Sequence, residues 1–476
     1  MIEAHTVALP SRRTPRWFFV SIAIGAYAAL VAVAPAAKTA AIFVSPLFLA
    51  AIAWWTLARP NRWIGAFIAA AVLLPPLPVA LGNTGPHPAL LFAALGIFAG
   101  ALYLRRWRIN FGGLELALLC LLAALAASVA LAAIYSGPDI AAQSLARVLL
   151  FTIGVYVFFY AAYVDAGDRA PRLTMLFWAA AASAAIACVD FYYQLPAPAG
   201  FSPQFVWLST GMYRRAQGIF YEAGTLGNFC TFFLVMIAVA WTRPAKQRPV
   251  SRVALVTGGV LFSAALIFSY SRASILNLAA ALAALAWLHR ARIPWRRVVP
   301  LLGASIASAA VAGYYLLPAF WDAFWFRLSG SAFYFFDYTE AIFSGRLESW
   351  RILLRFLAEH PWHAILGVGY KTLPYSDYIG QTVIADNMYL SMLVETGIVG
   401  LTALVAFNFA VLRTAGRAAR SSSPAAVFFG TWMFCFWVGQ TFQMLSADLL
   451  TYWRVMPVYF LVLAWAVRES RQAPAQ

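Results

Sequence analysis

Apolar runs of roughly 18 or more residues, long enough to cross a lipid bilayer as one helix, recur along this chain from end to end. Of its 476 residues, 63% are apolar and 11% are charged, whereas a soluble domain has about 45–50% and about 25%. The alternating segments typical of a membrane β-barrel are absent from the sequence. The sequence therefore predicts an all-α polytopic membrane protein and excludes a soluble enzyme, a disordered chain and a disulfide scaffold.

These runs predict about 12–14 transmembrane helices in one helical domain over residues 1–476. Two connections are long: a smaller loop at 193–222 and a large loop at 318–388, in the C-terminal half. Function is expected beside these loops, because the other connections are short. The expected helices are 17–35, 40–57, 63–81, 88–104, 114–134, 143–163, 173–192, 223–241, 252–269, 273–289, 298–317, 389–412, 425–446 and 450–467.

The formal net charge of +17 is concentrated in every second connection between the predicted helices. Because Lys and Arg gather in cytoplasmic loops, this pattern predicts that both termini are cytoplasmic and both long loops periplasmic. The charge is thus a signal of topology, and we expect no nucleic-acid partner. The basic connections contain Arg12, Arg13 and Arg16; Arg59 and Arg62; Arg105, Arg106 and Arg108; Arg169 and Arg172; residues 243–252 and 290–297; Arg413, Arg417 and Arg420; and Arg468 and Arg471.

The large loop contains an amphipathic helix, predicted from Gly345 to about Glu359 and ended by Pro361. Such a helix suits a lid at the membrane surface as well as part of a binding site. Its predicted apolar face consists of Leu347, Trp350, Leu353, Leu354 and Leu357.

Two arginines on the predicted periplasmic side are not explained by topology. Arg215 precedes the eighth helix, and Arg272 lies in the turn between the ninth and tenth. One interpretation is an interfacial arginine that extends its guanidinium to water. The other is a clamp for an anionic headgroup, because the planar guanidinium matches phosphate oxygens. Two such arginines suit a diphosphate.

An ordered set of motifs accompanies these arginines. It resembles the O-antigen ligase and polymerase superfamily over about residues 200–405. The resemblance implies a metal-independent glycosyltransferase of the bacterial inner membrane, without a cofactor. Its donor is a glycan on undecaprenyl diphosphate, and its acceptor is a hydroxyl of lipid A–core or of another glycan, among membrane lipids. The motifs are Arg215-x-x-Gly218, Ser271-Arg272, Gly345-Arg346 with Trp350, His360-Pro361 with Gly367-x-Gly369, and Asp386-Asn387 before Gly397-x-x-Gly400.

The resemblance also implies roles for individual residues. Arg215 and Arg272 match the arginines that bind the diphosphate, and Arg346 supports the site from the large loop. Asp386 stands where the ligases typically have a histidine regarded as the catalytic base. A carboxylate can accept the same proton, and the aspartate favours a polymerase or exopolysaccharide enzyme over a lipopolysaccharide ligase.

Three further residues have alternative roles. His360 is the rival base or a structural loop residue, Glu222 orients an arginine or binds sugar, and Asn387 supports the site or caps the following helix. A transporter or flippase of lipid-linked saccharide is the alternative function. It is disfavoured because the sequence has no internal repeat and its unexplained charges gather at one leaflet.

Overall fold

The computed structural model describes residues 37–59, 61–77, 86–165, 167, 169–198, 200–208, 211–290, 318–333 and 346–472, with residues 307, 311, 314 and 315 between them. The chain forms two compact units, residues 1–62 and 63–476. In the first unit, helix α2 spans Ala37–Leu57, and Arg62 donates a hydrogen bond of 3.0 Å to Trp55 O. The site lies entirely in the second unit.

Among the described residues, six helices are long and apolar enough to cross a membrane: α5, α6, α7, α8, α16 and α17. Helices α3, α4, α9 and α10 are apolar but shorter. The prediction of an all-α polytopic membrane protein is thereby confirmed. The predicted helix at 17–35 and most of that at 298–317 lie outside the described residues. The bounds are α3 (Arg62–Leu73), α4 (Ala89–Leu102), α5 (Gly113–Ser136), α6 (Pro138–Tyr163), α7 (Ala170–Tyr193), α8 (Ala223–Trp241), α9 (Arg252–Phe268), α10 (Arg272–Leu288), α16 (Met388–Ala418), α17 (Pro424–Gln443) and α18 (Met456–Gln472).

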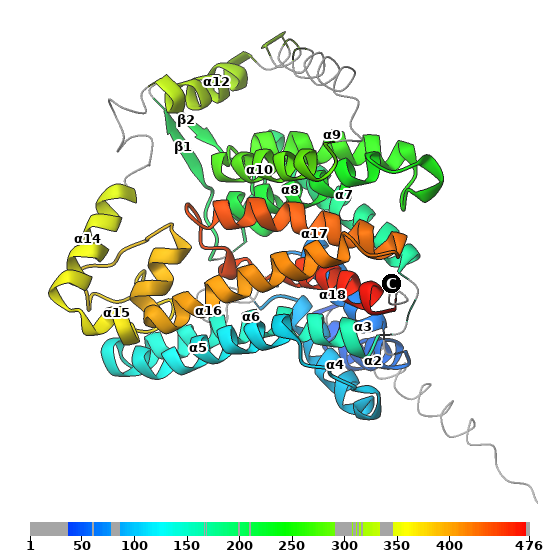
Figure 1. Ribbon diagram of the computed structural model, residues 1–476, viewed down its shortest axis with the longest axis horizontal. Helices are drawn as coiled ribbons and strands as arrows, with labels where there is room; N and C mark the ends of the chain where they lie inside the picture. The colour runs from blue at the N-terminus through cyan, green and yellow to red at the C-terminus, as the bar shows by residue number, and fades with distance from the viewer. Residues whose placement is uncertain are drawn as a thin grey trace, which may run out of the picture. The chain divides into compact units, whose positions relative to one another are not determined.

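Helices α16, α17 and α18 pack against one another in the middle of the second unit (Figure 1). On one side α16 contacts α5 and α18 contacts α6, and on the other side α17 contacts α8 and α10. Helices α7 and α9 pack against each other beside α8. Large buried aromatic side chains fill the space between these helices, among them Trp432, Trp437 and Trp465.

A buried network of amides also joins these helices. Asn228 of α8 and Asn277 of α10 each donate hydrogen bonds to Gln440 and Gln443 of α17, at 2.7–3.0 Å. Tyr459 of α18 donates to Asn228 at 2.6 Å. Such bonds between helices stabilise a bundle in lipid, where water cannot replace them.

Two predicted helices have different bounds, and proline explains both. The helix expected at 63–81 ends at Leu73, because Pro75 and Pro76 follow and lack the N–H that a helix interior needs. The helix expected at 450–467 begins only at Met456, with Pro457 in its first turn, where proline is tolerated. Residues 449–455 instead form the short 3₁₀ helix η4 (Leu449–Thr451) and turns.

The two long loops contain regular structure. Between α7 and α8 lie an antiparallel hairpin, β1 (Phe205–Leu208) with β2 (Gly211–Arg214), and the 3₁₀ helix η2 (Gly218–Phe220). The large loop contains α12 (Pro318–Phe333), α14 (Arg346–Glu359) and α15 (Trp362–Leu366).

The amphipathic helix is present as α14, but its buried face is turned slightly from the predicted one. Leu353 and Leu357 are buried together with Phe356. Leu354 is 55% exposed, because one residue along a helix turns the side chain by about 100° away from Leu353. The prediction was therefore wrong for Leu354.

Candidate functional site

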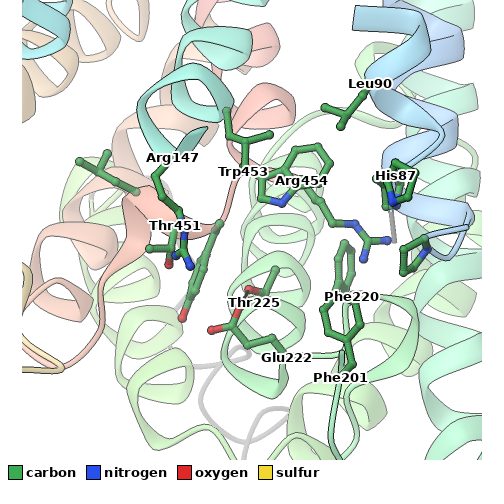
Figure 2. Close-up of a pocket in the computed structure, with 15 residues that line it drawn as sticks. His87, Leu90, Arg147, Phe201, Phe220, Glu222, Thr225, Thr451, Trp453 and Arg454 are labelled. Atoms are coloured by element: carbon green, nitrogen blue, oxygen red, sulfur yellow. Dashed lines mark hydrogen bonds between the residues drawn. The ribbon is translucent and has the colours of Figure 1, made fainter. Parts of the chain in front are cut away.

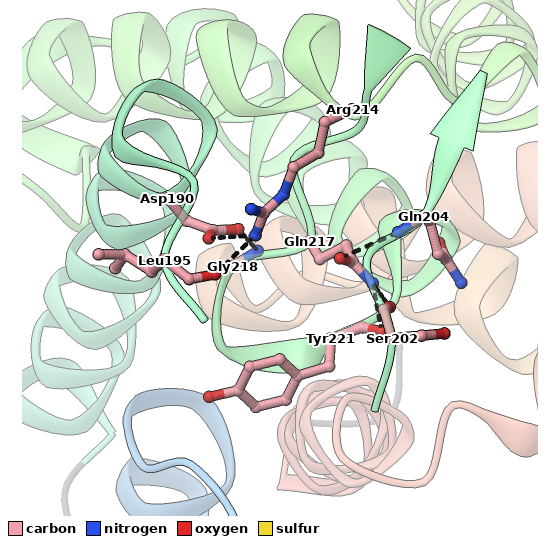
Figure 3. Close-up of polar contacts among 8 residues, drawn as sticks. All are labelled: Asp190, Leu195, Ser202, Gln204, Arg214, Gln217, Gly218 and Tyr221. Atoms are coloured by element: carbon pink, nitrogen blue, oxygen red, sulfur yellow. Dashed lines mark hydrogen bonds and ion pairs between the residues drawn. The ribbon is translucent and has the colours of Figure 1, made fainter. Parts of the chain in front are cut away.

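A buried carboxylate anchors the chain between α7 and α8. Asp190 of α7 accepts hydrogen bonds from Arg214 Nη2 at 3.2 Å and from the backbone N–H of Gly218 at 3.1 Å (Figure 3). Arg214 also donates to Leu195 O at 2.7 Å. Arg214 therefore has a structural role, which distinguishes it from its neighbour Arg215.

A buried glutamine holds the same segment. The Gln217 side chain accepts from the backbone N–H of Gln204 at 3.2 Å and donates to Ser202 O at 3.1 Å and Tyr221 O at 2.8 Å (Figure 3). These bonds fix the backbone on both sides of η2. The Gln217 bonds thus hold the loop segment that carries Arg215 and Glu222 together, and Asp190 attaches it to α7.

Arg215 contacts the turn between α9 and α10. Its Nε donates a hydrogen bond of 2.8 Å to Ser269 O at the end of α9. Ser271 caps α10, and Arg272 is the first residue of that helix. The turn approaches α8 closely, since a Cβ atom at Gly227 would lie 2.8–3.0 Å from three serine side chains. This packing brings Arg215 and Arg272 together.

The large loop adds a third arginine and a carboxylate. Arg346 begins α14, and its Nε lies 3.1 Å from Asp386 Oδ2. One turn along α14, Trp350 donates its indole N–H to Ala385 O at 2.7 Å. This bond holds the start of α14 beside Asp386, which has a φ of 44° just before α16.

The three arginines, Arg215, Arg272 and Arg346, form what we call the arginine cluster. Burial lowers the pKa of the Arg215 guanidinium, Tyr452 and Glu222 raise it, and Arg346 and Arg272 lower it again. Arg346 and Arg272 also interact electrostatically with each other. Like charges held together in a half-buried site favour an anionic ligand, and guanidinium groups suit phosphate oxygens.

Glu222 lies at the edge of the cluster. Thr225 donates a hydrogen bond of 2.6 Å to its Oε2. Burial raises the pKa of the Glu222 carboxyl, the bond from Thr225 and the charge of Arg215 lower it, Asp386 raises it, and Arg147 lowers it. Burial is the dominant cause, so the net shift is upward. Two carboxylates, Glu222 and Asp386, therefore accompany the three arginines.

A buried ion pair lies beside these groups. Lys371 pairs with Asp448, which lies just before η4. Glu395 of α16 accepts the backbone N–H groups of Lys371 and Leu373. Burial lowers the pKa of the Lys371 ammonium, and the charge of Glu395 raises it. These contacts connect the end of the large loop to α16 and to the segment before α18.

A cavity of about 560 Å³ adjoins the cluster (Figure 2). Glu222 and Tyr452 belong both to its wall and to the electrostatic surroundings of Arg215. The arginines of the cluster and Asp386 do not line it. The wall consists of Pro76, Pro86, His87, Leu90, Arg147, Leu150, Phe201, Phe220, Glu222, Thr225, Leu450, Thr451, Tyr452, Trp453 and Arg454.

Comparison with known families identifies the region that contains most of this cluster. Residues 257–405 match the family model described as O-antigen ligase. This region of the chain is similar to O-antigen ligases. This match confirms the resemblance to the O-antigen ligase and polymerase superfamily and implies a ligase- or polymerase-type activity on glycans in a membrane. A comparison with curated proteins gave no match.

Three of the predicted site residues, Arg272, Arg346 and Asp386, lie inside the matched region. Arg215 and Glu222 precede it and reach it through the packing of the α9–α10 turn on α8. Asn387 caps α16, because its Oδ1 accepts the N–H of Leu390 at 3.1 Å. The capping interpretation of Asn387 is therefore confirmed.

The structure does not bring His360 to the arginine cluster. His360 follows the end of α14, where it is exposed and stacks on Phe356 with ring centroids 5.0 Å apart. Arg346 begins the same helix, and fourteen steps of about 1.5 Å along the axis separate the two residues by about 20 Å. Asp386 is the predicted base that contacts the cluster.

Two groups that flank the arginine cluster were not predicted from the sequence. Tyr452 was placed inside a helix, although Pro457 signals that the helix begins later. The Lys371–Asp448 pair joins two distant loops, so no spacing in the sequence announces it. The one available signal was the rarity of lysine on the predicted periplasmic side.

Among the described residues, no group of three or more His, Cys, Asp or Glu side chains is placed to hold a metal ion. Metal independence of the protein stays a prediction.

Proposed function

We propose that this protein is a glycan transferase of the bacterial inner membrane. It moves a saccharide from undecaprenyl diphosphate to an acceptor hydroxyl at the periplasmic face. The observation that carries the proposal is the convergence of three arginines and two carboxylates beside a cavity at one end of the bundle. The match to O-antigen ligases supports the same chemistry.

The orientation follows from the distribution of charge. The proposed site lies at the end of the bundle where α8, α10 and α16 begin. Basic residues of the short connections, including Arg169, Arg172 and Arg243, belong to the opposite end, where α7 begins and α8 ends. By the positive-inside rule the opposite end is cytoplasmic. Helix α18 ends on that side, and the cytoplasmic N-terminus stays a prediction from the sequence.

In this proposal Arg215, Arg272 and Arg346 bind the donor diphosphate. Their guanidinium groups stabilise the negative charge that develops on the leaving diphosphate, which is the charge that a transferase must stabilise most. No metal ion or other cofactor is needed for that role.

Asp386 serves as the general base. In the structure its carboxylate pairs with Arg346, and a bound diphosphate would draw Arg346 away and leave Asp386 free to accept a proton. The acceptor oxygen attacks the anomeric carbon and transfers its proton to Asp386. The bond from that carbon to the diphosphate oxygen breaks with inversion, and its electron pair leaves with undecaprenyl diphosphate.

The acceptor that fits best is a second lipid-linked glycan, as in a polymerase or exopolysaccharide enzyme. We prefer this acceptor to lipid A–core because the chain has Asp386 where ligases typically have a histidine.

The experiment uses the full chain in liposomes with a lipid-linked saccharide donor. Asp386→Asn and Arg215→Ala are expected to lower product formation by about 100-fold or more, the loss seen when one group that stabilises a transition state is removed. Arg355→Ala, an exposed arginine on α14, is the matched control and retains activity.

Wild-type product levels in both site variants would contradict the assignment. Loss of activity in His360→Ala but not in Asp386→Asn would make His360 the base. Movement of the donor across the bilayer without formation of a glycosidic bond would favour a flippase.

A further inference from the structure

Aromatic side chains form part of the cavity wall. Phe201, Phe220, Tyr452 and Trp453 contribute to its wall (Figure 2). Its volume of about 560 Å³ is within the range of about 300–1,000 Å³ for small-molecule sites. Flat aromatic faces beside a few polar groups suit a ligand with both apolar and hydroxyl-bearing faces.

The basic groups of the cavity wall already have partners, and two of them contact its aromatic side chains: Arg454 lies over the Phe220 ring, and His87 packs edge-on to Trp453. Arg147, the third basic residue of the wall, donates a hydrogen bond of 2.6 Å to the Tyr375 hydroxyl. Arg454 donates hydrogen bonds to Ala71 O at 3.0 Å, Leu74 O at 3.1 Å and Ile219 O at 2.5 Å. Burial and the charge of Arg454 lower the pKa of His87 to about 4, although a hydrogen bond of 3.0 Å to Leu74 O raises that pKa in part. His87 is therefore neutral at pH 7. This wall offers little to a phosphate, unlike the arginine cluster.

Three other polar groups of the wall, on Glu222, Tyr452 and Trp453, have free hydrogen-bonding capacity. Thr225 occupies Oε2 of Glu222, and Oε1 accepts no hydrogen bond from the part of the chain that the structure describes. Within the same described part, the Tyr452 hydroxyl and the Trp453 indole N–H also have no hydrogen-bond partner. A carboxylate facing a hydrocarbon chain would be costly, so these atoms favour a hydroxylated ligand over the isoprenoid.

We infer that this cavity is the acceptor subsite, which binds a sugar of the acceptor glycan against Tyr452 and Trp453 while Glu222 accepts a hydrogen bond from one of its hydroxyls. The inference rests on the proposed function. It assigns the arginine cluster to the donor diphosphate and the aromatic cavity to the neutral, hydroxyl-rich end of the other substrate.

The position of Glu222 favours the acceptor over the donor saccharide. In a displacement with inversion, the nucleophile approaches the anomeric carbon opposite the leaving diphosphate. Glu222 lines the cavity and also interacts electrostatically with both Arg215 and Asp386. A sugar in the cavity therefore presents its hydroxyl past Glu222 toward the base, while the diphosphate stays on the arginines.

The test measures initial rates with the full chain in liposomes while donor and acceptor concentrations are varied separately. The donor is the lipid-linked saccharide extracted from the producing cells. The acceptor probes are the saccharide that mild acid releases from that lipid and a lipid A–core oligosaccharide, neither of which has an isoprenoid diphosphate.

Trp453→Ala is expected to raise the acceptor KM about tenfold, which corresponds to the loss of about 1.4 kcal/mol of aromatic contact, with the donor KM within twofold of wild type. Thr451→Trp, which fills the cavity, is expected to raise the acceptor KM further. Trp362→Ala, an exposed tryptophan on α15, is the matched control and leaves both constants unchanged.

Each outcome bears on one of the two proposals. Product formation by wild type with an unchanged acceptor KM in both cavity variants overturns the acceptor subsite and leaves the proposed function standing. A rise confined to the donor KM also overturns it and assigns the cavity to the donor saccharide. If wild type forms no glycosidic bond with either probe, nor with the lipid-linked saccharide as acceptor, the proposed function itself is overturned.

If a cavity variant fails to fold, a thiol-labelling experiment on Thr451→Cys decides the question. The active probe should protect this cysteine from a small thiol reagent. Equal labelling with and without that probe counts against the subsite.

Discussion

At the end of the bundle where α5 and α7 begin, arginines pair individually with carboxylates. These pairs are Arg169–Glu469, Arg172–Asp165 and Arg471–Glu115. At the opposite end, Arg215, Arg272 and Arg346 are gathered in one place and share Asp386 and Glu222. Paired charges tie helix ends together, whereas gathered like charges are costly until an anion joins them. The difference separates structural arginines from arginines suited to a ligand.

The largest effect is expected from the Lys371–Asp448 ion pair, which lies at the same end of the bundle as the arginine cluster. Lys371→Met removes the partner of buried Asp448 and is expected to lower the free energy of unfolding by about 3–5 kcal/mol, because a buried charge loses its counterion. Unfolding in detergent, followed by circular dichroism against denaturant, measures the loss. The double variant Lys371→Met with Asp448→Leu is the control and should recover part of it. A loss below about 1 kcal/mol in the single variant would contradict this role.

The second prediction tests the packing that gathers the arginines. Gly227→Ala places a Cβ atom 2.8–3.0 Å from three serine side chains of the α9–α10 turn. Overpacking of this kind costs about 1–3 kcal/mol. Because it also displaces Arg215 from Arg272, product formation should fall below that of other variants with the same melting temperature.

Gly259→Ala in α9 is the matched control, since its Cβ would lie 4.0 Å from Ile237 and meet only ordinary contact. Equal activity of the two variants would show that the Arg215–Arg272 arrangement tolerates a shift of the turn.

The smallest effect is expected at the opposite end. Arg471→Ala breaks a pair of 2.9 Å with Glu115, but Glu115 keeps hydrogen bonds from Tyr163 at 2.7 Å and from the N–H of Gly112 at 3.0 Å. We expect a loss of at most about 1 kcal/mol, typical of a partly exposed pair, and unchanged product formation. A loss of activity comparable to that of Arg215→Ala would remove the distinction between the two ends.

Local sequence predicted most helices well, because long apolar runs define helices in a membrane irrespective of their neighbours. It failed at α3 and α18, where the apolar run continues past the position at which proline ends or begins the helix. It also offered Arg215 and Arg272 as a joint clamp for an anionic headgroup, and the family motifs assigned both to the diphosphate. Spacing alone did not distinguish Arg214, which pairs with Asp190, from Arg215, which does not.

The sequence by itself determined the class of the protein, the positions of most helices and the set of charged residues that topology leaves unexplained. These properties depend on hydrophobicity and charge along the chain. Only the tertiary structure decided which of those charges meet: it joined Arg346 to Asp386, kept His360 at the far end of α14 and brought Tyr452 and Trp453 to the cavity. Contacts between distant segments depend on how helices pack and where they end, and no short stretch of sequence contains that information.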